Sequence, residues 1–186
     1  KIANFLYELG TMRKLMRIHR QTFLTDDMSD SITSHSYRVA MIGWFLAKEE
    51  GADPYKVVMM SLLHDVGEIR SNDHNWIHKR YTKIFDQEIK QEQLGTHPFG
   101  EIKEVIDEYD KRESKESIVA KDADLEDQIF LMREYVWQGN KEAQRWLDEL
   151  DVDSRFKTES ARSLVRTTMT ESPSSWWTNL STGKIR

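Results

Sequence analysis

The stretch VVMMSLLHDVGE, residues 57–68, joins the most apolar run of the chain to a histidine–aspartate pair. An Asp-Pro pair at residues 53–54 precedes it, with an N-cap candidate followed by a proline suited to the first helical position. The run shows no polar face, so we expect the most buried helix here, ending at Gly67. His64 and Asp65 would then lie at the end of a buried helix. A carboxylate there needs compensation, because burying an unpaired charge is costly.

Apolar residues recur at helical spacing on both sides of this stretch. Only 8 Gly and 3 Pro interrupt 186 residues, and no segment shows sustained strand alternation. We therefore expect an all-α fold, a single irregular helix bundle. The same spacing places Trp44, Trp137 and Trp146 in the core. The expected helices cover residues 1–20, 33–51 with Thr33 or Ser34 as the cap, 53–67, 80–94, 99–109, 114–137, about 141–150 and 156–170.

Composition excludes several classes of protein. Lys plus Arg is 27 and Asp plus Glu is 32, giving a formal charge of −5, which argues against a broad surface for a nucleic-acid polymer. No apolar run approaches the ~20 residues of a membrane span. Cysteine is absent, which excludes a disulfide framework, a thiolate zinc site and a cysteine nucleophile. These features suit a reducing compartment, and we expect a cytoplasmic protein.

Three expected helices carry four residues whose side chains are suited to metal binding. His35 begins the second helix, His64 and Asp65 end the third, and Asp124 lies inside the long helix. A divalent cation is a common compensation where imidazoles and carboxylates converge. The alternative interpretation is structural, with Asp65 hydrogen-bonding a neighbour near its helix end. The residues alone leave both interpretations open.

These four residues form the pattern H…HD…D, and with it the chain resembles the HD-domain metal-dependent phosphohydrolase superfamily. Within the superfamily it is similar to the branch of small single-domain 5′-deoxynucleotidases. The resemblance implies an HD-domain fold for a single domain over residues 1–186, with a metal-binding core at about 20–138 and a C-terminal helical extension at about 140–186. The matching segments are SHSYRVA at 34–40, LHDVGEIRSND at 63–73, IDEY at 106–109 with Glu113-Ser114, and VAKDAD at 119–124.

The resemblance further implies one divalent metal ion, held by His35, His64, Asp65 and Asp124. Mixed nitrogen and oxygen ligation suits Mn, Co, Fe, Mg or Zn. Asp122 is the near alternative to Asp124, but the family phrase ends in Ala-Asp, which favours Asp124.

A second metal would require further histidines between the HD pair and the last aspartate, as in the binuclear members of the superfamily. His78 and His97 lie in this interval, but their surroundings do not match the binuclear pattern. We therefore expect a single metal ion.

Two acids near the HD pair are expected to be catalytic. By resemblance, Glu68 orients or deprotonates the attacking water, and Asp73 also serves the reaction. Glu68 follows His64 by four residues, so a continuous helix would put both on one face. The alternatives are a solvent-exposed carboxylate in the last helical turn for Glu68 and a turn-forming residue for Asp73.

Three further residues are candidates for contact with substrate. Arg20 lies fifteen residues before His35, the offset at which the nucleotidases place a phosphate-binding arginine, although the aromatic residue adjacent to it in the family is replaced here by Gln21. Lys79 follows the catalytic loop. Glu108 matches a family acid near the substrate when a one-residue length difference is allowed.

The sequence thus predicts a metal-dependent phosphomonoesterase that releases phosphate from (deoxy)nucleoside 5′-monophosphates by means of a metal-activated water. The alternatives are a nucleotide pyrophosphohydrolase or phosphodiesterase of the same superfamily, and a non-catalytic nucleotide-sensing HD scaffold. The expected partner is a small-molecule nucleotide, with no nucleic-acid polymer and no membrane. A homodimer is compatible with the aromatic and methionine content, and we expect Trp176-Trp177 to secure the tail or a subunit contact.

Overall fold

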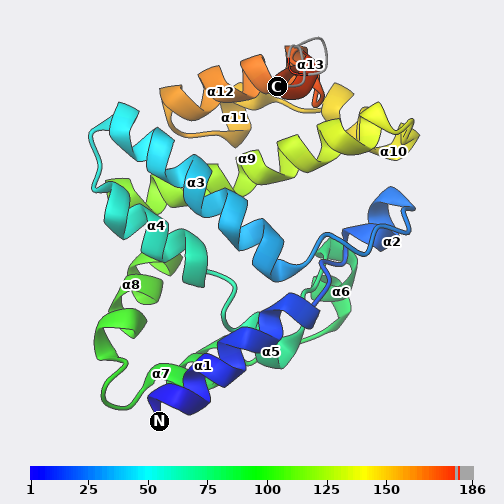
Figure 1. The fold of residues 1–186 in the computed structure, drawn as a ribbon. Helices are drawn as coiled ribbons and strands as arrows, with labels where there is room; N and C mark the ends of the chain where they lie inside the picture. Colours follow the sequence, from blue (N-terminus) through cyan, green and yellow to red (C-terminus); the bar gives the residue numbers. More distant parts are fainter. Residues whose placement is uncertain (179, 181–186) are drawn as a thin grey trace.

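Helices make up the regular structure of residues 1–178 and 180, the part of the chain that this computed structural model describes (Figure 1). Within it, β structure is limited to one isolated bridge, so the all-α prediction is confirmed. The elements are α1 (Ile2–Gly10), the 3-10 helix η1 (Thr11–Lys14), α2 (His19–Phe23), α3 (Ile32–Glu50), α4 (Pro54–Leu63), α5 (Glu68–Ser71), α6 (Trp76–Tyr81), α7 (Asp86–Leu94), α8 (Gly100–Lys111), α9 (Lys115–Trp137), α10 (Lys141–Asp148), α11 (Val152–Arg155), α12 (Glu159–Thr170) and α13 (Ser175–Thr178). None of these helices is long and apolar enough to cross a membrane.

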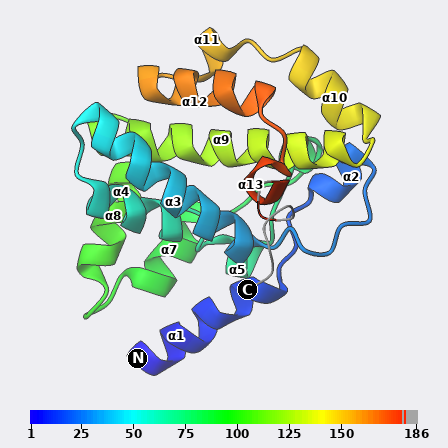
Figure 2. The same ribbon diagram turned by 45° about the horizontal axis from the view of Figure 1, so that its top comes forward.

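The long helix α9 lies at the centre of the bundle. Helix α3 crosses it, α12 packs along one side, and α4 and α8 lie on the opposite side (Figures 1 and 2). The main core lies between these helices and includes Val39, Leu46, Val57, Met60, Val119, Ala123, Leu131 and Val165. Helices α3 and α4 approach closely at Gly43, where an added Cβ would lie 2.8 Å from Val57 Cγ1.

A smaller apolar cluster lies below the end of α4. Leu63 and Val66 are buried in it together with residues of α1, α7 and α8. They flank His64 and Asp65 in the chain, so packing on both sides fixes the turn that presents these two residues. The end of α4 is therefore positioned by apolar contacts as well as by its own hydrogen bonds.

Side-chain caps define the starts of the three central helices. Asp53 caps α4, as the sequence indicates, and Ser114 caps α9. The cap of α3 is Ser31 rather than Thr33 or Ser34. Its hydroxyl accepts from Ser34 N at 3.1 Å, while Ser34 Oγ accepts from Ser31 N in a reciprocal capping box.

Several expected helices differ from those observed. The single helix expected at residues 1–20 is three elements, because the backbone becomes extended at Leu15 and α2 begins only at His19. The helix expected at residues 80–94 is likewise interrupted, since α6 ends at Tyr81 and α7 begins at Asp86. Residues 80–94 contain no glycine or proline, so no local residue signals the second interruption, whereas Gly10 stands at the end of α1.

Two predictions about the core are also wrong. Met59 and Leu62 are exposed, so α4 has a solvent side despite its apolar sequence. Trp137 is exposed at the last position of α9, beyond the part of the helix that α3 and α4 cover. Trp146 packs against the core as expected.

Two buried acids of α9 join this helix to α12. Asp122 accepts hydrogen bonds from the backbone N–H groups of Lys157 and Thr158 and from the Thr158 hydroxyl, at 2.7–3.1 Å. Glu126 accepts from Thr168 Oγ1 at 3.0 Å. Burial raises the pKa of Glu126 to about 8, so this side chain is a neutral acid at pH 7.

The protonation of Glu126 makes stability depend on pH in a defined direction. The ordinary pKa of this carboxyl is 4.5, so the unfolded chain has lost the proton above pH 4.5. The folded state keeps it up to about pH 8. The free energy of unfolding should therefore fall as pH rises through this window. We expect Glu126→Gln, which cannot ionise and keeps an acceptor for Thr168, to be more stable than the wild type at pH 8.5 by roughly 2–4 kcal/mol. At pH 5 the two should be nearly equal.

Urea unfolding at both pH values measures the difference. Glu101→Gln on the exposed side of α8 is the control for the exchange itself. If the stability difference between Glu126→Gln and the wild type were no larger at pH 8.5 than at pH 5, the assignment of a neutral buried acid would be contradicted.

Candidate metal centre

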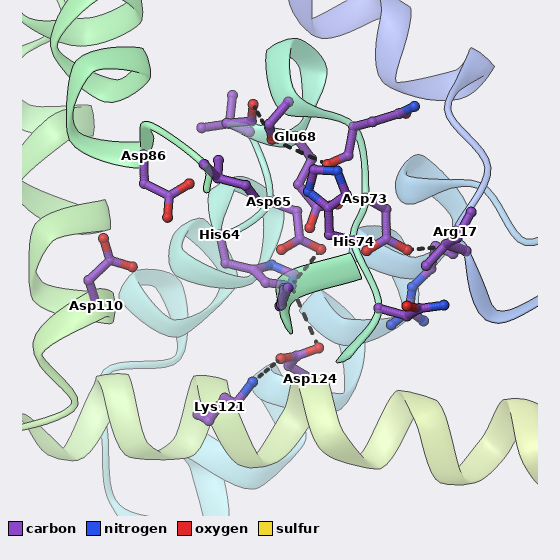
Figure 3. A pocket seen from close by; sticks show the side chains of 18 of the residues that line it. Arg17, His64, Asp65, Glu68, Asp73, His74, Asp86, Asp110, Lys121 and Asp124 are labelled. Carbon is purple, nitrogen blue, oxygen red and sulfur yellow. Dashed lines mark hydrogen bonds and ion pairs between the residues drawn. The ribbon is translucent and has the colours of Figure 1, made fainter. Parts of the chain in front are cut away.

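Three segments of the fold bring four predicted ligands together. His35 comes from the first turn of α3. His64 and Asp65 come from the turn that follows α4, and Asp124 from α9 (Figure 3). The ligand atoms of His35, His64 and Asp124 all lie within 4.8 Å of one another. His35 Nε2 is 3.2 Å from His64 Nε2 and 3.3 Å from Asp124 Oδ1. Asp65 Oδ2 lies 3.1 Å from His64 Nε2 and 3.6 Å from His35 Nε2.

The outer nitrogens of both imidazoles are already engaged. His64 Nδ1 donates to the Ser61 carbonyl at 2.8 Å, and His35 Nδ1 lies 2.6 Å from Asp127 Oδ2. A carbonyl oxygen can only accept, so the proton of neutral His64 is assigned to Nδ1 and its Nε2 carries a lone pair. The carboxylate of Asp127 favours the same tautomer for His35.

Two lone pairs that face each other at 3.2 Å repel unless a positive charge lies near both. With two carboxylate oxygens beside them, a divalent cation fits this arrangement, because it accepts all four donors at once. The set of two imidazoles and two carboxylates suits a borderline or hard divalent ion and leaves coordination positions for water and phosphate oxygens.

The pKa values report the same demand for positive charge. Burial alone would lower the pKa of His64, but the Asp65 and Asp124 carboxylates outweigh it and raise this pKa well above its usual value. Burial opposes ionisation of the two carboxyls, yet the histidines hold the pKa of Asp65 at about 2 and that of Asp124 well below its usual range. The carboxylates stay ionised in the interior because a positive partner compensates them.

Asp127 orients His35 and was not identified from the sequence. It is buried, and its Oδ1 accepts from Arg38 Nε at 2.5 Å, while Arg17 Nη1 lies 3.4 Å from its Oδ2. Two guanidinium groups thus compensate a carboxylate that would otherwise be unpaired. The signal present in the sequence is spacing, because Asp127 follows Asp124 by three residues and so shares its face of α9.

Asp122 does not belong to the cluster. Its carboxylate points toward α12 and is used by the backbone and hydroxyl of Lys157 and Thr158. Two residues along a helix is more than half a turn, which places Asp122 and Asp124 on different faces of α9. Of the two candidates, the structure brings Asp124 to the histidines.

Glu68 lies beside the cluster but not on the helix of His64. Helix α4 ends at Leu63, and Glu68 begins the short helix α5 after the turn. Its Oε2 is buried and has no hydrogen-bond partner. Burial, together with the nearby Asp65 and Asp73 carboxylates, raises the pKa of Glu68 to about 9. The side chain is therefore not the solvent-exposed acid of the alternative interpretation.

The remaining predicted site residues divide into two groups. Asp73 and Lys79 line the cavity beside the cluster, and Asp73 Oδ2 accepts from Ile18 N at 2.6 Å, which fixes the loop before α6. Arg20 and Glu108 are not among the residues that line this cavity. Arg20 Nη2 lies 3.8 Å from Asp26 Oδ1, and Glu108 forms an ion pair with Lys56 of α4.

His78 and His97 do not form a second metal site in the part of the chain that the structure describes, where a single group of three or more candidate ligands occurs. The His78 ring packs against His74, 5.8 Å away, and His97 lines a separate hollow beside α1.

The cavity next to the cluster has a volume of about 830 Å³, within the usual range for small-molecule sites. Its wall holds cationic side chains that the sequence did not single out, among them Lys121 and Arg112. Lys121 Nζ donates to Asp124 Oδ2 at 2.7 Å (Figure 3). The Arg112 guanidinium lies 3.3 Å from the centre of the Tyr109 ring, which in turn packs beside His64. The site thus combines the cluster of two imidazoles and two carboxylates with a cavity wall that carries both cationic and acidic side chains.

Comparison with known proteins shows which family the chain resembles. A family model described as HD domain matches residues 12–165. The chain is 27% identical over 150 residues to 5′-deoxynucleotidase HDDC2 of Dictyostelium discoideum, an alignment that covers 72% of this chain and 78% of the relative. Among solved structures, it is similar to a conserved hypothetical protein from Pyrococcus furiosus, with a TM-score of 0.74, 22% identity and coverage of 90% of this chain and 98% of the other.

A more distant similarity links the fold to the cyanophage S-2L HD phosphohydrolase DatZ, whose structure holds dA and one catalytic Zn²⁺ ion. Here the TM-score is 0.55 at 14% identity, over 89% of this chain and 96% of the other. The family model spans α3, α4 and α9, the three helices whose residues form the cluster. On this basis the chain belongs to the HD domain family and is a metal-dependent phosphohydrolase.

Proposed function

We propose that this protein is a phosphomonoesterase that releases phosphate from (deoxy)nucleoside 5′-monophosphates by means of a metal-activated water. The observation that carries the proposal is the buried Oε2 atom of Glu68, which has no hydrogen-bond partner and lies beside the cluster of His35, His64 and Asp124. A 5′-deoxynucleotidase among the relatives and a deoxyadenosine-bound structure among the similar folds support the nucleotide as substrate.

The proposed chemistry divides among the residues that line the cavity. His35, His64, Asp65 and Asp124 would hold a divalent cation, which would polarise phosphoryl oxygens and make water a stronger acid. Glu68 removes a proton from the attacking water, and the positive charge of the cluster favours the ionised carboxylate that this step requires.

Phosphate is held by cations of the cavity wall. Lys79 and Lys121 line the cavity, and both project ammonium groups that can compensate phosphoryl oxygens. They take the place that the sequence assigned to Arg20, which lies outside the cavity. Asp73, anchored by Ile18 N, assists at the leaving 5′-oxygen.

Phosphate release from a substrate panel tests the proposal. We expect dAMP and other deoxynucleoside 5′-monophosphates to be hydrolysed in the presence of Mn, Co, Fe, Mg or Zn, and chelation to abolish the reaction. A cyclic dinucleotide and a 3′-pyrophosphorylated nucleotide serve as competing substrates. Faster turnover of either would assign the protein to the phosphodiesterases or pyrophosphohydrolases, and binding without turnover of any would indicate a nucleotide sensor.

The role of Glu68 predicts a loss of rate without a loss of metal. Glu68→Gln keeps the size of the side chain but removes the base, so kcat should fall by roughly 10²–10⁴-fold while metal content stays at the wild-type level. Glu88→Gln, an exposed glutamate of α7, should leave kcat unchanged. Full activity in Glu68→Gln would remove this residue from the mechanism.

A matched pair of α9 variants separates the metal ligand from the structural acid. Asp124→Asn should weaken metal binding by roughly tenfold or more, because it removes a charged ligand from the cluster. Asp122→Asn should retain the metal and lower stability by about 1–3 kcal/mol, because it weakens the hydrogen bonds to residues 157–158. Metal content by mass spectrometry and urea unfolding give the two readouts. Equal metal content in both variants, or the reverse pattern, would contradict the assignment.

A further inference from the structure

The cavity extends beyond the metal cluster along one face of α9. Asp124, Leu125 and Gln128 line it in succession, so it follows the helix for about one turn, or roughly 6 Å, past the metal ligand. A second hollow of about 550 Å³ continues from there between α9 and the α10–α11 segment. The residues common to both hollows are Trp76, Leu125, Gln128, Trp146 and Arg155.

Two indole rings are among these shared residues. Trp146 of α10 is half-buried and packs edge-on against Phe23, with ring centres 5.1 Å apart, so its position is fixed by the core. Trp76 differs, because 62% of it is exposed although it lines the cavity. An exposed indole on a cavity wall offers a free aromatic face to a ligand.

The backbone below Trp76 is held in place by a specific set of hydrogen bonds. Asn75 caps α6 by accepting from Ile77 N and His78 N, and its Nδ2 donates to Gln21 Oε1 at 2.8 Å. Together with the bond from Ile18 N to Asp73, this ties the loop before Trp76 to the α2 segment at two points. Trp76 is thus a solvent-accessible ring on an anchored backbone.

We propose that Trp76 is the stacking platform for the nucleobase of the substrate and that Gln128 faces the edge of the base from α9. The proposal rests on the nucleotide phosphomonoesterase function above. With phosphate at the cluster, the sugar spans the helical turn that separates Asp124 from Gln128, and the base reaches the hollow that Trp76 and Trp146 share. Gln21 contributes by holding Asn75, not by stacking.

Stacking of a base on an aromatic ring tolerates every base, since each has a π-face. Trp76 should therefore strengthen binding of all four deoxynucleoside 5′-monophosphates relative to a sugar phosphate that lacks a base. The amide of Gln128 offers both a donor and an acceptor, so it contributes discrimination among bases rather than general affinity.

The experiment compares dAMP with 2-deoxyribose 5-phosphate, which carries the same phosphate and sugar without the base. Binding is measured by calorimetry in the metal-loaded Glu68→Gln protein, where turnover is slow, and KM and kcat are measured in the protein with Glu68 intact. Trp76→Ala should raise Kd and KM for dAMP by about 5–100-fold and leave the values for 2-deoxyribose 5-phosphate within about twofold. Trp76→Phe should recover most of the affinity for dAMP.

Trp137→Ala is the matched control. Trp137 has the same exposed fraction of 62% and lies outside both hollows. Its removal should therefore leave the binding of both ligands unchanged. Unchanged dAMP binding in Trp76→Ala, or equal weakening of both ligands, would overturn the stacking role and leave the phosphomonoesterase function intact. A Glu68→Gln protein that binds no nucleotide, together with an intact enzyme that hydrolyses none, would overturn both.

Discussion

The structure depends on one electrostatic constraint: two imidazole lone pairs and two carboxylates converge in a partly buried space and require a cation. Each Nδ1 is committed to a protein acceptor, Ser61 for His64 and Asp127 for His35, so neither ring can turn its Nε2 away from the other without losing a hydrogen bond. The demand for a positive charge, which a proton on His64 meets when no ion is bound, is therefore built into the fold. Stability and function are in tension at this point, because the packing that buries the cluster brings together groups that are unfavourable without a positive charge.

The acids of helix α9 lie on two faces of the helix, and the two faces have different partners. Asp122 and Glu126 point toward α12 and serve cohesion, the first as an acceptor for backbone N–H groups and the second as a neutral acid. Asp124 and Asp127 point toward α3, the first toward the imidazoles of His35 and His64 and the second as the partner of His35. Four acids within six residues are tolerated in one buried helix because each has a different means of compensation: hydrogen bonds, protonation, the histidines, and guanidinium groups.

Features that depend on residues close together in the sequence could be predicted, and features that depend on residues far apart could not. The ends of α9, the cap Asp53, and the proposed ligand set depend on residue types at short spacing or on a known motif. Lys79 lies at the cavity, whereas Arg20 and Glu108 do not, because their positions depend on how α2 and α8 dock. The partnership of Asp127 with Arg38 joins residues 89 positions apart, and no periodicity reports such a contact.

The non-helical segments after α4 and before α6 build the site. A continuous helix through residues 64–71 would carry His64 and Glu68 on one face, but the observed turn at 64–67 sends α5 in a new direction and lets Glu68 reach the cluster from a separate element (Figure 3). A similar interruption before α6 anchors Asp73 to Ile18 and sets Trp76 on the cavity wall. Helices α3 and α9 supply His35 and Asp124, and the turn after α4 supplies His64 and Asp65, whose positions are fixed by the buried neighbours Leu63 and Val66. The short segments between and after them surround the space where a substrate and water must enter, so the irregularity of the bundle is concentrated where the chemistry requires access.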